Sequence, residues 1–159
     1  MSLLPFFQWM EALAFSQAIA RSSWLAAAFN LAHLLLLVVF AGAVLIVDLR
    51  LLGTGITAQP LNRVASNARP WMMWAFVGLL LTGIPSMTTY AIKQYYSPFF
   101  WFKMEVMVVA VIFTLTLRHR VTQADESRIG PYWGKAVGLA SIALWTMVAV
   151  PARLIGLLS

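Results

Sequence analysis

The sequence predicts an all-α membrane protein, a four-transmembrane-helix up-down bundle preceded by an N-terminal amphipathic surface helix. Two observations lead to this fold class. Apolar residues make up 62% of the 159-residue chain and charged residues only 10%, with a mean hydropathy of +0.84. A soluble domain is usually nearer half apolar and a quarter charged. The apolar residues also gather into four long stretches, and we expect a single integral membrane domain over residues 1–159.

Each of the four stretches has the length of a transmembrane helix. A hydrocarbon core of about 30 Å requires about 20 residues at a rise of about 1.5 Å per residue. Backbone groups in lipid find hydrogen-bond partners only within the protein, so each span is expected to be helical. The predicted spans cover about 23–47, 70–92, 98–118 and 135–157.

The segment before the first span has a different pattern. Gln8, Glu11 and Gln17 interrupt its apolar residues, and the basic cluster of a signal peptide does not precede it. Its apolar residues recur at helical spacing: Phe6, Trp9, Met10, Leu13 and Ala14. This pattern predicts an amphipathic helix over about 4–19 that lies on the membrane surface.

Positive charge predicts the orientation of the bundle. Seven basic residues are expected at one end: Arg50, Arg63, Arg69, Arg118, Arg120, Arg128 and Lys135. Four are expected at the other: Arg21, Lys93, Lys103 and Arg153. Because cytoplasmic loops carry the excess of Lys and Arg, we expect the first end to be cytoplasmic and both termini to lie outside. The expected location is a bacterial inner membrane.

The composition also excludes several classes of function. The chain has no cysteine, so it has no disulfide, thiolate metal site, iron–sulfur cluster or thiol nucleophile. Its net charge of +6 is spread over short loops, so nucleic acid is not an expected partner. The sequence contains no recognisable nucleophile–base triad or phosphate-binding glycine loop. The lipid bilayer is the expected partner.

Polar residues inside the membrane are the most informative part of such a sequence, because placing them in lipid is costly. One side of the first span carries a polar line that is expected to face the bundle: Asn30, His33, Leu37, Ala41, Val44 and Asp48. Asp48 is expected to form a local ion pair with Arg50 where this span ends. His119, which stands between two arginines, is expected at the membrane interface.

The two histidines are too far apart to share one site. At about 1.5 Å of rise per residue, His33 lies roughly 13 Å below the outer boundary and His119 roughly 30 Å below it. The first and third helices run parallel in an up-down bundle, so about 18 Å separates the two imidazoles vertically. We do not expect them to bind one iron within a single chain.

His33 is the predicted metal ligand of a cofactor site in the outer half of the bundle, and the predicted cofactor is haem b. Imidazole is a common haem ligand, and methionine is found opposite it in some haem proteins. The other residues of the predicted site supply that second ligand, a polar neighbour or cations for the propionates: Met107, Met147, Asn30, Lys103 and Arg153. Ordinary roles are the alternative. His33 can hydrogen-bond a neighbouring helix, the methionines can be packing residues, and Lys103 can extend to the surface.

Short motifs along nearly the whole chain resemble a bacterial family of four-helix membrane proteins of unknown function. They are Leu31-Ala32-His33-Leu34-Leu35, Val47-Asp48-Leu49-Arg50-Leu51-Leu52-Gly53, Thr82-Gly83, Tyr95-Tyr96-Ser97-Pro98-Phe99, Lys103-Met104, His119-Arg120 and Ser141-Ile142-Ala143-Leu144-Trp145. The resemblance implies the same four-helix fold and brings no activity with it.

A more distant resemblance connects the chain with the CopD copper-resistance and HemJ protoporphyrinogen-oxidase proteins. His33, Ala41-Gly42 and Trp101-Phe102-Lys103 match elements of that group. In the HemJ proteins the corresponding His and Lys are tied to haem b binding and activity, so the resemblance implies a role for His33 and Lys103. The chain lacks the Tyr-His pair that usually closes the first helix of HemJ, and it has Phe102 where a His is common.

The sequence therefore predicts a haem-b-binding integral membrane protein that acts in electron transfer or as a redox subunit. Its expected partners are a redox protein or a second copy of the chain. The alternative is a cofactor-free membrane subunit or assembly factor of a larger complex, whose polar residues join helices or contact a partner. A small transporter is disfavoured, because the sequence shows neither repeats nor broken helices. The sequence leaves open whether the protein is an enzyme.

Overall fold

The computed structural model describes residues 3–124 and 130–157, and within these ranges it describes all side chains except those of 131 and 153–157. Helices account for most of the described chain. In order they are α1 (Leu4–Ala12), α2 (Ala14–Arg21), α3 (Ser23–Leu52), α4 (Leu61–Thr89), α5 (Ala91–Tyr95), α6 (Pro98–Phe113), the π-helical η1 (Thr114–Arg118), α7 (His119–Gln123) and α8 (Pro131–Leu157).

Four segments are long and apolar enough to span a membrane: Ser23–Leu52, Leu61–Thr89, Pro98–Gln123 and Tyr132–Ala152. The third consists of α6, η1 and α7 in unbroken succession. The predicted fold class is confirmed, because the protein is an all-α, multi-pass membrane protein with four spans behind an N-terminal helical segment. α3 ends later and α4 begins earlier than the sequence predicts, so both helices extend toward the loop that joins them.

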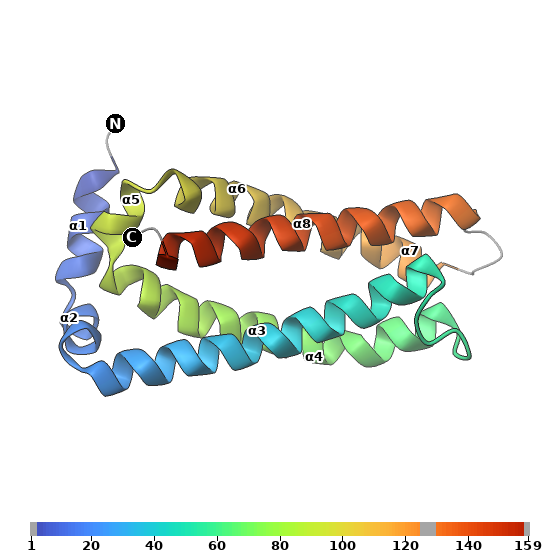
Figure 1. The fold of residues 1–159 in the computed structure, drawn as a ribbon, viewed down its shortest axis with the longest axis horizontal. Helices are drawn as coiled ribbons and strands as arrows, with labels where there is room; N and C mark the ends of the chain where they lie inside the picture. Colours follow the sequence, from blue (N-terminus) through green and yellow to red (C-terminus); the bar gives the residue numbers. More distant parts are fainter. Residues whose placement is uncertain (1–2, 125–129, 158–159) are drawn as a thin grey trace.

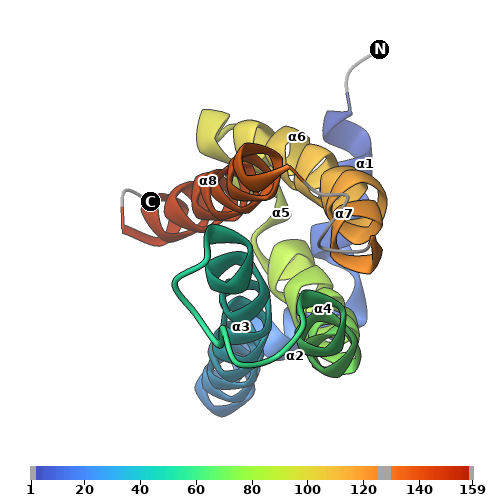
Figure 2. The same ribbon diagram turned by 90° about the vertical axis from the view of Figure 1, so that its right-hand side faces the viewer.

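The four long helices form two antiparallel pairs (Figure 1). α4 packs along α3, and α8 packs along α6. A view along the bundle shows the pairs beside one another (Figure 2), and α8 also contacts α3. The pairs approach one another at the end that holds the 53–60 loop and α7, which we call the loop end. They diverge toward the opposite end, which α1, α2 and α5 cover and which we call the capped end.

Two short helices, α1 and α2, replace the single surface helix that the sequence predicts. The break lies at Leu13, where the backbone becomes extended with a ψ of 137°. Phe7 and Met10 of α1 are buried in an apolar cluster with residues of α5 and α6. The Glu11 carboxylate accepts a 2.8 Å hydrogen bond from the backbone N–H of Ile92. These contacts fasten α1 across the capped end.

Local sequence signals define the ends of the spans. Ser22 caps α3 by accepting a 3.3 Å hydrogen bond from the Leu25 N–H. α3 stops at Gly53, whose φ of 78° is a left-handed conformation that glycine adopts without a side-chain clash. Pro98 opens α6 at a position where a helix needs no N–H donor. The first and third spans therefore both start at the capped end and run parallel.

α4 contains two prolines, Pro70 and Pro85. A proline removes one backbone donor from a helix, and hydroxyl side chains help to satisfy the groups around it in a membrane. Near Pro85 the hydroxyls of Ser86, Thr88 and Thr89 donate to α4 carbonyls at 2.8–2.9 Å. The second span thus continues through both prolines as one helix.

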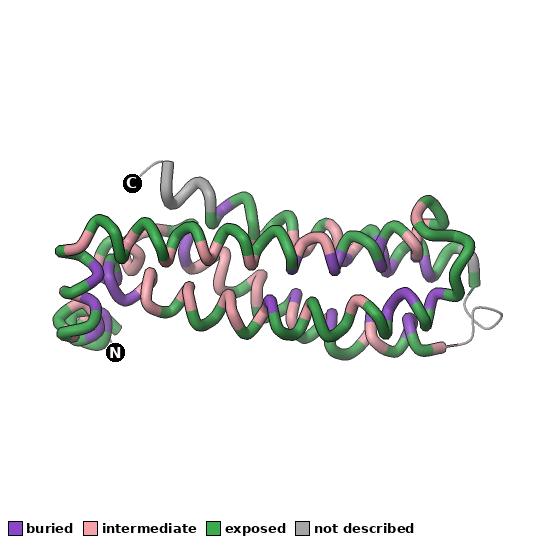
Figure 3. The backbone as a smooth tube through the Cα atoms, turned by 90° about the horizontal axis from the view of Figure 1, so that it is seen from below, coloured by how far each residue is buried: buried purple, intermediate pink, exposed green. Residues whose placement is uncertain are grey.

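Buried residues occur near both ends of the bundle and at its middle (Figure 3). One apolar cluster fills the loop end: Val47, Leu51, Leu61, Val64, Ala65, Val121 and Val137. Phe40, Val44 and Ala75 form the middle cluster, and a third cluster around Phe7 and Phe100 closes the capped end. The stretch between the middle cluster and the capped end is packed differently.

Candidate functional site

We call this stretch the open layer, and it consists of residues 24–39 of α3, 76–87 of α4 and 101–109 of α6. Every one of these residues is at least partly exposed. A helix of a bundle normally buries one face in a close-packed core. The absence of such a face here agrees with the divergence of the two pairs in Figure 1. The open layer is therefore the least closely packed part of these three helices.

His33 lies in the open layer and is held against α4. Its Nδ1 is 2.8 Å from the hydroxyl oxygen of Thr82. A Cβ at Gly83 would lie 3.2 Å from His33 Cε1, so the missing side chain at this position leaves room for the imidazole. Thr82 and Gly83 thus give the ring a hydrogen-bond partner and a surface to lie on.

The hydrogen bonds of Thr82 determine which nitrogen of His33 is free. A hydroxyl has one hydrogen, and that of Thr82 is donated to the Gly78 carbonyl at 2.8 Å. The hydroxyl oxygen then accepts the Nδ1–H of His33, which places the lone pair of the neutral imidazole on Nε2. Nε2 has no hydrogen-bond partner among the described residues. Metal-ligating histidines usually have this arrangement, with the second ring nitrogen donating to a protein acceptor.

The structure places some of the other predicted site residues in the same layer. Lys103 is half-buried on α6 and lies close enough to the imidazole to interact with it electrostatically. Met107, one turn further along α6, is also half-buried. Asn30 is exposed and Met147 is 45% exposed, so the bundle encloses neither. The side chain of Arg153 lies outside the described residues.

The open layer does not bring together the ligands that a bare metal ion needs, but it could supply a haem with a protein ligand. In the described part of the chain, no group of three or more His, Cys, Asp or Glu side chains is placed to hold a metal ion. Haem iron is held by the porphyrin nitrogens as well, so it requires only one or two ligands from the protein. His33 offers one such ligand through Nε2, and Lys103 offers a cation for a carboxylate.

A second polar site, nearer the loop end, is the buried ion pair of Asp48 and Arg118. Arg118 Nε lies 2.8 Å from Asp48 Oδ1, and the two side chains are 6% and 0% exposed. A terminal nitrogen of Arg118 also donates to the Val44 carbonyl at 3.0 Å. The expected local pair of Asp48 with Arg50 is therefore wrong, because Asp48 pairs across the bundle and Arg50 donates to the Gln59 carbonyl.

A π-helical turn accompanies the entry of Arg118 into the interior. η1 interrupts the third span immediately before α7, and π-helical turns are frequent at functional sites. On α8, Ser141 is a polar neighbour of the Asp48 carboxylate. Asp48 Oδ2 and Ser141 Oγ are both buried, and neither makes a hydrogen bond of good geometry within the described structure. With Met72 of α4 also 3.8 Å from an Arg118 nitrogen, the ion pair lies where all four spans meet.

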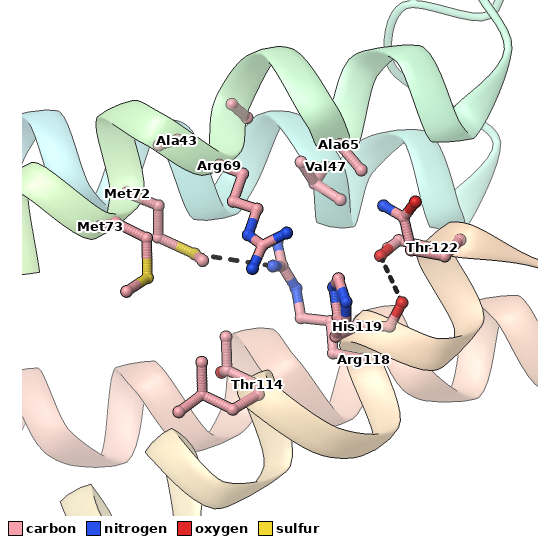
Figure 4. A pocket seen from close by; sticks show the side chains of 13 residues that line it. Ala43, Val47, Ala65, Arg69, Met72, Met73, Thr114, Arg118, His119 and Thr122 are labelled. Carbon is pink, nitrogen blue, oxygen red and sulfur yellow. Dashed lines mark hydrogen bonds between the residues drawn. The ribbon is translucent and has the colours of Figure 1, made fainter.

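His119 belongs to a different part of the bundle from His33. It is the first residue of α7, is half-buried, and lines a pocket at the loop end together with Arg69 and Arg118 (Figure 4). The middle cluster around Phe40 lies between this pocket and the open layer. The two histidines therefore serve separate sites, in line with their spacing in the sequence.

The profile of a protein family of unknown function, DUF6644, matches residues 6–158, which is nearly the whole chain. The chain belongs to the DUF6644 family. Neither a curated protein nor a solved structure matches it. Membership agrees with the resemblance to a four-helix family of unknown function, and it brings no activity to this DUF6644 protein.

Sequence reasoning missed three residues that organise the sites of the DUF6644 protein: Thr82, Arg118 and Ser141. Thr82 and Ser141 belong to short motifs in the sequence, but their contacts depend on which helix packs against their own. Arg118 resembles the other basic residues near the loop end, and only its partner distinguishes it. The available signal was the presence of opposite charges, Asp48 and Arg118, toward the same end of two parallel spans.

Proposed function

We propose that this DUF6644 protein binds haem b in the open layer and acts in electron transfer, as a carrier or as a redox subunit of a membrane complex. The observation that supports the proposal most directly is the free Nε2 of His33, which Thr82 keeps in one tautomer within a loosely packed layer. The resemblance of His33 and Lys103 to the haem-linked residues of the HemJ group points in the same direction.

In this proposal the residues of the open layer hold and orient the cofactor. His33 would bind the iron through Nε2, with Thr82 orienting the imidazole by accepting its Nδ1–H. Lys103 would neutralise a propionate, and Met107 would be the candidate for a further protein ligand. When bound, haem supplies one-electron chemistry at a potential that its axial ligands and surroundings set. The apolar side chains of the layer keep water away from the ring.

We further propose that the protein lies in a bacterial inner membrane with its loop end in the cytoplasm. The excess of basic residues at the loop end supports this orientation. α1 and the last turns of α8 both lie at the capped end (Figure 1), so both ends of the described chain face one side. A reporter fused after residue 159 is expected to be active outside the cytoplasm. Activity restricted to the cytoplasm would contradict the orientation.

A reduced-minus-oxidised absorbance spectrum of the purified protein tests the haem proposal. We expect a b-type spectrum from the parent and none from His33→Ala. His119→Ala should leave the spectrum nearly unchanged, because His119 lies beyond the middle cluster. Lys103→Ala should weaken haem binding or shift the potential. Membrane fractionation of His33→Ala is the control, since α3 remains long and apolar without the imidazole.

A cofactor-free subunit is the second candidate function, and the His33–Thr82 contact itself favours it. This hydrogen bond joins α3 to α4, as polar side chains commonly do in membrane proteins. A colourless parent protein, or a full haem complement in His33→Ala, would reject the haem proposal. The second candidate then predicts that His33→Ala lowers the thermal stability of the colourless protein.

A further inference from the structure

The pocket at the loop end is not used by the proposed haem site. Its volume is about 60 Å³, which is room for a few water molecules. It therefore suits one small chemical group and not an organic cofactor. Its lining comes from α3, α4, η1 and α7 (Figure 4), and the polar part of that lining is Arg69, Thr114, Arg118, His119, Thr122 and Gln123.

The lining carries an excess of positive charge. None of the 13 described residues that line the pocket is acidic. Asp48 compensates Arg118 from outside the lining, whereas Arg69 has no ion-pair partner among the described residues. Figure 4 shows the Arg69 side chain reaching from α4 toward the Arg118 guanidinium. Two guanidinium groups on one pocket repel one another, and an anion bound between them would remove this repulsion.

Arg118 also has hydrogen-bonding capacity left for an anion. Its Nε donates to Asp48, and one terminal nitrogen donates to the Val44 carbonyl. Among the described residues, the other terminal nitrogen contacts only the Met72 sulfur, at 3.8 Å, and thioether sulfur is a weak acceptor. Arg118 is 5% exposed, and a buried donor without a good acceptor is costly. Because Met72 and Arg118 both line the pocket, this donor lies at the pocket wall.

We propose that the pocket binds the phosphate group of an anionic molecule at the membrane surface, with Arg118 and Arg69 as its charged ligands. The guanidinium fork matches a phosphate in charge and geometry. His119, Thr122 and Gln123 supply further polar groups around the same space. This site does not depend on the haem proposal, because the two lie on opposite sides of the middle cluster.

The phosphate has two sources, the headgroup of an anionic phospholipid and free inorganic phosphate. Two probes of the detergent-purified full chain separate them. Native mass spectrometry measures binding of phosphatidylglycerol, with phosphatidylcholine as the zwitterionic comparison. A thermal-shift titration with inorganic phosphate, against chloride at equal ionic strength, measures binding of the free ion.

The informative variant is Arg69→Gln, since Arg69 is exposed and its replacement leaves the ion pair of Asp48 and Arg118 intact. Arg63→Gln is the matched control, because Arg63 is an exposed arginine of the same helix outside the lining. We expect binding of the successful probe to be about tenfold weaker in Arg69→Gln, as for the loss of one charge-assisted hydrogen bond. Arg63→Gln should match the parent. Gln123→Ala, another exposed position of the lining, should weaken binding less.

Each result decides the proposal. Binding of phosphatidylglycerol that Arg69→Gln weakens, without a response to inorganic phosphate, supports the site and identifies a lipid headgroup. A response to inorganic phosphate alone, again weakened by Arg69→Gln, supports the site and identifies the free ion. The proposal is overturned if the parent binds neither probe, or if Arg69→Gln and Arg63→Gln bind both as the parent does.

Discussion

Polar side chains have different kinds of partner in the open layer and at the loop end. At the loop end, Asp48 and Arg118 neutralise one another beside a close-packed apolar cluster. In the open layer, His33 makes one hydrogen bond and keeps a free nitrogen among partly exposed neighbours. Both sites stand on the first and third spans. The difference teaches that a buried charge pair can fasten one part of a membrane bundle, while a single hydrogen bond between helices leaves a ring nitrogen of His33 without a partner among the described residues in the other.

Breaking the ion pair should have the largest effect on stability. Asp48→Ala leaves the Arg118 charge buried without a partner, which costs about 3–5 kcal/mol of unfolding free energy. Reversible denaturation of the purified protein in detergent measures this loss. Glu105→Ala is the control, because Glu105 is exposed and its removal should change stability by less than about 0.5 kcal/mol. Equal stability of Asp48→Ala and the parent would show that the pair does not fasten the loop end.

Replacing both members of the ion pair is a stricter test of its contribution to stability. Asp48→Leu combined with Arg118→Met leaves no unpaired charge, and apolar replacements of buried ion pairs are often neutral or stabilising. The double variant should therefore recover most of the stability that Asp48→Ala loses. A double variant as unstable as the sum of its single substitutions would mean that the two side chains act independently.

Two glycine-to-alanine substitutions test whether the loop end is packed more tightly than another part of the bundle. A Cβ at Gly138 would lie 3.1 Å from both the Asp48 carbonyl oxygen and Leu51 Cβ, whereas a Cβ at Gly42 meets nothing within 4 Å. Gly138→Ala should cost about 1–3 kcal/mol of unfolding free energy through overpacking. Gly42→Ala should be neutral or stabilise slightly, because alanine favours helix. Thermal melts of both variants check the ranking, and equal effects would contradict it.

The smallest expected change in stability comes from the open layer. Thr82→Val removes the partner of His33 Nδ1 and should cost about 1 kcal/mol, the usual size of a hydrogen bond between membrane helices. If the layer binds haem, the same change should lower haem affinity by about 10–100-fold. Thr116→Val is the control, because the exposed Thr116 donates only to the Ile112 carbonyl of its own span. If both variants retained haem equally, haem binding by His33 would not depend on its hydrogen bond to Thr82.

The fold was predictable because a bilayer permits few solutions to a sequence of this composition. Span length, helical backbone and the parallel course of the first and third helices all follow from it. The partner of His33 was not predictable, because it depends on the rotation of α4 about its axis and on the bare surface at Gly83. The partner of Asp48 was missed because local spacing favoured Arg50 over a residue from a distant span.

The break at Leu13 had a similar cause. Apolar spacing continues through this position, so the sequence alone predicts one surface helix. The structure bends the segment around the capped end, where Phe7 is buried and Glu11 accepts the Ile92 N–H. Contacts with α5 and α6 therefore decide the geometry of a segment whose own pattern permits a straight helix.

The π-helical turn of η1 acts as a phase shift within the third span. One residue advances an α-helix by about 100°, so the wider turn reorients everything after Thr114–Arg118 relative to Lys103 and Met107 before it. An unbroken α-helix through the same number of residues would turn Arg118 away from Asp48, whereas deleting Leu115 would remove the extra residue of the π-helical turn and leave Arg118 facing Asp48. The residues before the π-helical turn can therefore face the open layer while those after it face the loop end, although both belong to one continuous helix.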